Sequence, residues 1–169
     1  METQFPEIPD YIKELIASGN EIDEIMIDKE GVWYHKGEKF INEKIISFFS
    51  KSVNITADGQ YVIHYGDYTY PIKVEDTPYF VTGVTFNGFG DFEKISLNLS
   101  SGETEELNCS TLYFKKNNAL YCRVKEGKMP AKFKRSPSFN ILERLEESAD
   151  GKFHLRLCGQ IIELNIKDE

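Results

Sequence analysis

Residues 58–74 read DGQYVIHYGDYTYPIKV, and this stretch decides the fold. An Asp-Gly turn signal opens it, apolar and polar residues then alternate, and a Gly-Asp turn leads into another short run. Short alternating runs bounded by such turns are typical of a β-hairpin. Residues 150–166, DGKFHLRLCGQIIELNI, repeat the pattern 92 positions later without a gap. The sequence therefore predicts an internal duplication.

The segments before the first hairpin supply the rest of one repeat. Residues 25–27 and 32–35 flank an Asp-Lys-Glu-Gly turn, which predicts another hairpin, and Gly37 then breaks the strand. Apolar residues from about 42 to 52 recur at helical spacing and predict one helix.

The segments before the second hairpin follow the same order. A strand at residues 119–124 precedes a break at Gly127, and Ser136 as N-cap with Pro137 in the first turn opens a helix. The second break is longer than the first by about five residues. The two halves thus share one arrangement of strand, break, helix and hairpin.

Four more short strands separated by Gly- and Asn-containing turns lie between the repeats, as in an antiparallel meander. A further short helix is expected at residues 9–18. No strands and helices alternate as in βαβ units, so we predict an α+β protein with antiparallel sheets and two tandem repeated lobes, each with one helix. The predicted lobes are residues 1–80 and 81–169, packed tightly because no Pro-, Gly- or Ser-rich linker separates them.

The composition excludes several classes of protein. A net charge of −8 with 28% charged and 13% aromatic residues describes a folded acidic protein, for which duplex nucleic acid is an unfavourable partner. No secretory signal is visible and no window reaches the ~18 apolar residues of a membrane helix, so we expect a cytoplasmic protein without membrane contact. The three cysteines form no CxxC pair and the histidines show no metal spacing. We therefore expect no metal and no cofactor.

The charge distribution is the sharpest functional signal. Residues 115–135 contain eight basic residues and one acid, so this segment carries +7 while the rest carries −15. Such segregation indicates a local anion site, next to a helix start whose backbone N–H groups also attract anions. The residues suited to hold a phosphate or carboxylate are Arg123, Lys125, Lys132, Lys134 and Arg135.

The same basic segment has a structural interpretation. Lysines at a strand edge keep a sheet from pairing with other chains, and their long stems cover apolar surface. The residues alone leave both interpretations open.

Two motifs resemble those of a bacterial family of unknown function, domain-of-unknown-function family 1285. They are Asp-x-x-Gly-Val-Trp-Tyr-His-x-Gly at residues 28–37 and Val-Glu-Asp-Thr-Pro-Tyr at residues 74–79, where the family has Ala for Thr77 and Phe for Tyr79. The resemblance spans about residues 25–166. It implies a duplicated core, a second lobe superficially like a pleckstrin-homology barrel, and a groove between the halves for a nucleotide-like or other phosphate-bearing ligand. It implies no enzymatic activity.

Two residues of the first lobe complete the predicted site. Trp33 and Tyr34 alternate along a strand, so we place Trp33 in the core and Tyr34 against the ligand. Asp76 either makes a turn with its own backbone or, if it faces the groove, accepts a hydrogen bond from a ribose or base edge. Glu75 and Asp76 point to opposite faces of a strand, so they do not form an acid–base pair.

Our first hypothesis is a binding or sensing module, of the kind used in signalling, for an anionic small molecule held between the repeats. The alternative is a protein–protein interaction module without ligand chemistry. An enzyme has the least support because the sequence contains no recognisable nucleophile–base pair.

Overall fold

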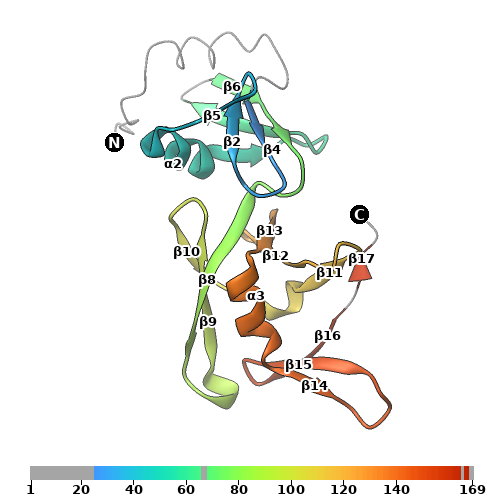
Figure 1. Cartoon of the computed structure of the whole chain (residues 1–169). Coiled ribbons are helices and arrows are strands. Elements are labelled where there is room, and N and C mark those ends of the chain that lie inside the picture. Colours follow the sequence, from blue (N-terminus) through green and yellow to red (C-terminus); the bar gives the residue numbers. More distant parts are fainter. Residues whose placement is uncertain (1–24, 66–67, 165, 168–169) are drawn as a thin grey trace. The chain divides into compact units, whose positions relative to one another are not determined.

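Two units make up the chain, Met1–Pro78 and Tyr79–Glu169. The structure, a computed structural model, describes residues 25–65, 68–164 and 166–167 (Figure 1). Each unit combines antiparallel-rich sheets with one described α-helix, so the predicted α+β class with two lobes is confirmed. The helix expected at residues 9–18 lies outside the described residues, and the close packing of the two lobes stays a prediction.

Unit 1 combines a four-stranded sheet, a three-stranded sheet and a helix. The sheets have the strand orders β3-β2-β1-β7 and β4-β5-β6, and only the β1–β7 pairing is parallel. The elements are β1 (Ile25–Ile27), β2 (Trp33–His35), β3 (Glu38–Lys39), α2 (Glu43–Ser52), β4 (Val53–Ile55), β5 (Tyr61–Tyr65), β6 (Tyr68–Pro71) and β7 (Lys73–Val74).

Helix α2 begins where its sequence predicts and carries the core of unit 1. The Asn42 side chain accepts hydrogen bonds from the backbone N–H groups of Lys44 and Ile45, which caps the helix. Phe49, on the buried face, is fully buried with its ring 5.9 Å from Trp33 and 5.7 Å from Phe40. Burial of one such ring stabilises the fold by roughly 1.5–3 kcal/mol, so this aromatic cluster contributes substantially to the core of unit 1.

Unit 2 contains a larger sheet. The strand order is β10-β9-β8-β13-β12-β11-β17, and a second sheet has the order β14-β15-β16. Helix α3 packs on β8 and β13 (Figure 1). The elements are β8 (Tyr79–Asn87), η1 (Gly90–Phe92), β9 (Lys94–Leu99), β10 (Thr104–Glu106), η2 (Cys109–Thr111), β11 (Tyr113–Lys115), β12 (Leu120–Val124), β13 (Met129–Phe133), α3 (Arg135–Leu142), β14 (Leu145–Glu147), β15 (Phe153–Leu157), β16 (Gln160–Glu163) and β17 (Ile166–Lys167).

The large sheet curls on itself. In the strand order, β9, β8 and β13 separate β10 from β12. Nevertheless the Lys125 backbone N–H, directly after β12, donates to the Glu105 carboxylate of β10 at 3.1 Å. The turn after β12 therefore lies next to β10, so the sheet of unit 2 is strongly curved.

The predicted duplication is confirmed by the strand registers. The pairs of β4, β5 and β6 recur in β14, β15 and β16 with every residue number raised by 92, as in Val53↔Ile63 and Leu145↔Leu155. The order β3-β2-β1-β7 recurs as β13-β12-β11-β17, with a parallel closing pair in both. We call β1–β7 with α2 repeat 1, and β11–β17 with α3 repeat 2. Strands β8–β10 are an addition that extends the second sheet beyond β13.

One local prediction is wrong. Helix α3 starts at Arg135, and the residue at its N-cap is Lys134, which makes no side-chain capping hydrogen bond. Ser136 is therefore inside the first turn rather than at the N-cap. Pro137 in that turn still suits the helix, because the first N–H groups of a helix have no intrahelical acceptor.

Candidate functional site

One face of the large sheet in unit 2 gathers basic side chains from several strands. Directly paired residues point to the same side of a sheet. Arg123 pairs with Pro130, and Lys132 pairs with both Tyr121 and Phe80, so these side chains share one face of β12, β13 and β8.

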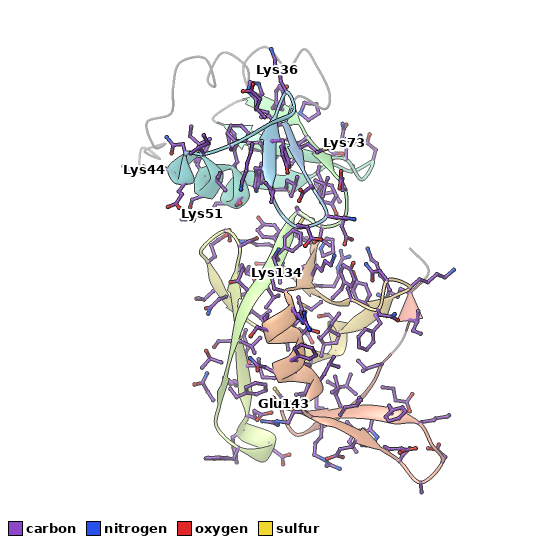
Figure 2. All side chains as sticks on the ribbon, in the orientation of Figure 1. Lys36, Lys44, Lys51, Lys73, Lys134 and Glu143 are labelled. Carbon is purple, nitrogen blue, oxygen red and sulfur yellow. The ribbon has the colours of Figure 1, made fainter. Side chains whose placement is uncertain are left out.

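The same face continues across β11 and β17. Tyr113 pairs with Tyr121, and Lys115, two residues along β11, pairs with Lys167. Lys134 follows β13 and lies at the start of α3 (Figure 2). Its ammonium lies over the Phe80 ring. We call this set the basic face: Lys115, Arg123, Lys132, Lys134 and Lys167.

Aromatic rings lie beneath the lysines. Tyr113 and Tyr121 stack with ring centroids 5.4 Å apart and an interplanar angle of 14°. The ammonium of Lys115 lies 4.5 Å from the Tyr121 ring centroid, and that of Lys167 lies 4.3 Å from the Tyr113 centroid. Both rings are buried, so they orient the cations through cation–π contact and cannot themselves stack on a ligand.

The strands that carry the basic face contain no acidic residue. Neither Asp nor Glu occurs in β8, β11, β12, β13 or β17. The corresponding strands of repeat 1 include Glu38 in β3. The five strands therefore carry basic residues and no acid, a composition that favours anions at their surface.

Arg123 holds its own hairpin. Its Nε and Nη2 atoms donate to the backbone carbonyls of Gly127 and Lys128 at 3.0 and 3.1 Å. Two of its five donors thus stabilise the β12–β13 turn. Arg123 contributes charge to the basic face, with its guanidinium fixed at one end.

Lys125 lies apart from the basic face. Its ammonium forms an ion pair with Glu103 at 2.7 Å and lies 5.4 Å from the Tyr79 ring centroid. Burial, together with the charges of Glu103 and Glu105, raises the pKa of the Tyr79 phenol well above its ordinary value. Lys125 therefore belongs to a mixed-charge cluster near β10, where an anion would meet two carboxylates.

Arg135 is the first residue of α3 and is exposed, with its guanidinium carbon 5.5 Å from the Phe139 ring centroid. It contributes charge at the start of the helix. The structure thus brings Arg123, Lys132 and Lys134 onto one face and separates Lys125 from them.

Tyr34 and Asp76, the remaining predicted site residues, belong to unit 1. The Tyr34 phenol donates a hydrogen bond to the Asp28 carboxylate. Burial, and to a lesser extent the negative charge of Asp28, raises the pKa of Tyr34. That bond helps hold the β1–β2 turn, where the Asp28 carboxylate also accepts the backbone N–H groups of Glu30 and Val32. Asp76 is half-buried after β7.

The site predicted from the sequence did not include Tyr113, Tyr121, Lys115 or Lys167. The repeat does contain a signal for Tyr121, because the pair Tyr34↔Lys39 of repeat 1 recurs as Tyr121↔Lys132. Lys167 has no such signal, since it reaches the face only through the parallel pairing of β17 with β11.

A second hollow in unit 2 is apolar. A cleft of about 530 Å³ lies between the end of α3, β17 and the β15–β16 hairpin, and Phe114, Leu145, Phe153 and Leu164 contribute to its walls. Phe153 and Leu145 are 54% and 40% exposed there.

Within the described residues, no three His, Cys, Asp or Glu side chains are grouped so that they could hold a metal ion. No helix in this part of the chain is long and apolar enough to cross a membrane.

The fold is similar to two solved structures. A DUF1285 family protein from Silicibacter pomeroyi DSS-3 superposes with a TM-score of 0.70 at 19% identity, covering 85% of this chain and 80% of that one. A DUF1285 family protein from Shewanella baltica OS155 gives 0.59 at 16% identity, covering 72% and 91%. No family model and no curated protein matches the sequence. The resemblance predicted from the two motifs is thus confirmed at the level of the fold, which is DUF1285-like.

Proposed function

We propose that this protein is a binding or sensing module for a phosphate-bearing, nucleotide-like small molecule, and that the basic face of unit 2 holds the phosphate groups. The observation that carries the proposal is the gathering of five cations over five adjacent strands that contain no acid. Lysine ammoniums bind phosphate as point charges, while an arginine adds directed hydrogen bonds.

The aromatic rings make this arrangement suitable for binding. A lysine whose ammonium lies on a ring loses less conformational entropy when an anion binds, because the cation–π contact already restricts its side chain. Helix α3 also begins beside Lys134, with no side-chain acceptor on its first N–H groups, and such a helix start favours negative charge.

The proposal includes three further expectations from the sequence. The curled sheet supports the predicted likeness of the second lobe to a pleckstrin-homology barrel, and a signalling role would follow from ligand sensing. A cytoplasmic location, where phosphate-bearing metabolites are abundant, is part of the same proposal.

Thermal denaturation against a panel of nucleotides and phosphorylated metabolites tests the site. A ligand that binds only the folded state raises the melting temperature. We expect Lys132→Ala and Lys134→Ala each to weaken a responding ligand about tenfold, as expected when one charge-assisted contact is lost. Arg123→Ala is a poor probe because it also releases the β12–β13 turn.

Lys152→Ala is the matched control, because Lys152 is an exposed lysine of the same unit that lies between β14 and β15 and belongs to none of the strands that carry the basic face. It should leave the response unchanged. A flat panel, or a response that both basic-face variants retain, would overturn the proposal.

A second candidate function uses the same face for an acidic segment of a partner protein. Neighbouring strands are about 4.8 Å apart, so five strands span about 19 Å, which is wider than one phosphate group requires. The predicted alternative of a protein-interaction module fits this width.

Fluorescence anisotropy with a labelled Glu-rich peptide separates the two functions. Saturable binding that Lys132→Glu and Lys134→Glu abolish, with no response in the small-molecule panel, would favour the protein partner. Binding of a small phosphate compound in the panel, with no saturable peptide binding, would favour the first function.

A further inference from the structure

Cys109 and Cys158 bring two thiols together in unit 2. Their Sγ atoms lie 3.5 Å apart although 49 positions separate the residues in the sequence. Cys109 is buried in η2, and Cys158 is half-buried in the turn between β15 and β16. A disulfide has an S–S distance of about 2.05 Å, so the sulfurs need to approach by about 1.5 Å to bond.

The surrounding contacts hold the Cys158 turn in this position. The Glu93 carboxylate accepts the Cys158 backbone N–H at 3.0 Å and is itself held by the Arg144 guanidinium at 3.2 and 2.8 Å. On the next residue, a Cβ added to Gly159 would lie 2.7 Å from the Asp91 Cα, so the turn packs directly against η1. The Cys158 thiol is therefore kept beside Cys109 by contacts that do not involve either sulfur.

The turn does not explain why residue 158 is a cysteine. Cys158 and Gly159 have φ values of 51° and 72°, as in a two-residue type I′ turn. Asn, Asp or Gly is preferred at the first of these positions because other side chains adopt this conformation at a cost. Cysteine at this position is therefore better explained by the chemistry of its sulfur than by turn preference.

A cleft gives a small oxidant access to both sulfurs. It has a volume of about 380 Å³, and both cysteines line it together with Glu106, Asn108 and Gln160. Burial and the neighbouring Cys158 thiol raise the pKa of Cys109 to about 12. The more exposed Cys158 is thus the sulfur that meets the oxidant first, and Cys109 is the one that resolves the intermediate.

We propose that Cys109 and Cys158 are a redox-modification site that forms an intramolecular disulfide with hydrogen peroxide as the oxidant. The Cys158 sulfur attacks one peroxide oxygen, so that an S–O bond forms, the O–O bond breaks and the leaving hydroxide takes up the thiol proton as water. The Cys109 sulfur then attacks the Cys158 sulfur, the S–S bond forms, and the sulfenic oxygen leaves as a second water with the Cys109 proton. Two thiols are oxidised and one peroxide is reduced to two waters.

Mass spectrometry of the full-length protein tests this site. The reduced protein is exposed to hydrogen peroxide, alkylated without denaturation and after denaturation, and mapped by proteolysis. We expect two of the three thiols to become inaccessible to alkylation, with a mass loss of about 2 Da for the two hydrogens removed. The proteolytic map should contain one linked peptide pair joining residues 109 and 158, and dithiothreitol should restore both thiols.

Single variants assign the two roles. In Cys109→Ser the Cys158 sulfenic acid has no resolving partner, so dimedone should trap it, whereas in Cys158→Ser neither the linkage nor the dimedone adduct should form. Cys122→Ala is the control, because Cys122 is fully buried and should play no part. Retention of three alkylatable thiols after peroxide treatment, a linkage through Cys122, or only intermolecular dimers would overturn the proposal.

Discussion

In repeat 1, helix α2 packs Phe49 against Trp33, while the matching positions of repeat 2 hold the smaller Ile141 and Leu120. Tyr70, also fully buried, corresponds to Ile162. The strand registers are nevertheless the same in both repeats. Backbone pairing and turn length therefore fix the register, and the volume of the core can change without altering it.

At the edge of the core, it is repeat 2 that has the larger apolar side chains, and they are more exposed. Val53 of repeat 1 is 7% exposed, whereas Leu145 at the same position of repeat 2 is 40% exposed in the apolar cleft. Ser50, which is buried, corresponds to Leu142, which lines the cleft. Repeat 2 thus has smaller apolar side chains at the centre of its core and larger ones at the edge than repeat 1. Other contacts are therefore needed to hold the β14–β15 hairpin in place.

The largest expected loss of stability tests the difference between the centres of the cores in repeats 1 and 2. Phe49→Ala should lower the free energy of unfolding by about 3–5 kcal/mol, because it removes a fully buried ring from an aromatic cluster. Ile141→Ala, the matched change in repeat 2, should cost about 2–4 kcal/mol. Urea denaturation followed by circular dichroism measures both, and a larger loss for Ile141→Ala would contradict the comparison.

A smaller effect should come from a contact that only repeat 2 possesses. Arg144 forms an ion pair with Glu93, an acid of the added β8–β10 region. The residue of repeat 1 that corresponds to Arg144 is Ser52. Arg144→Ala should cost about 2 kcal/mol, less than a fully buried pair, because the Arg144 side chain is 40% exposed. Ser52→Ala in the same denaturation assay is the matched control and should cost less than about 1 kcal/mol.

The pH dependence of stability sharpens this contrast. Hydrogen bonds from Arg144 lower the pKa of Glu93 below its ordinary value of 4.5, despite the opposing effect of burial. The folded state therefore binds this proton less readily than the unfolded chain, so the stabilisation is present above pH 4.5 and is lost as the pH falls through the folded pKa.

Urea denaturation between neutral pH and acidic pH checks the sign of this effect. Glu93→Gln should be less stable than the wild type at neutral pH and should approach it as the solution is acidified. A constant difference across that range would show that the Glu93 charge does not contribute.

The smallest effect is expected at the margin of the cleft. Leu145→Ala should cost less than about 1.5 kcal/mol, because a side chain that is 40% exposed gives up little buried area. Val53→Ala removes fewer atoms from a position that is 7% exposed, and should cost as much or more. A clearly larger loss for Leu145→Ala would mean that the cleft is closed in solution.

Much of this fold could be predicted from local patterns. Alternation between turn signals located β5, β6, β15 and β16, and apolar residues at helical spacing located α2. The start of α3 was misplaced because Ser136 and Pro137 form an attractive local signal, whereas the backbone leaves β13 at Lys134 and enters the helix at once.

The site depended more on pairing over long distances. The cluster in residues 115–135 indicated an anion site, but strand alternation decides which of its cations share a face. That alternation groups Arg123 with Lys132, whereas the ion pair with Glu103 draws Lys125 elsewhere. The parallel pairings β13–β8 and β11–β17 add Phe80 and Lys167. No local pattern predicts such pairings, and the meeting of Cys109 with Cys158 is equally non-local.

The parallel closing strand of each repeat has a consequence for synthesis on the ribosome. Every described strand pairing of unit 1 lies between residues 25 and 74, and the last to become available is β1–β7. This unit can complete its ladders while the second is still being translated. Repeat 2 must wait for β17, so β11 stays an open strand edge until residues 166–167 have been translated.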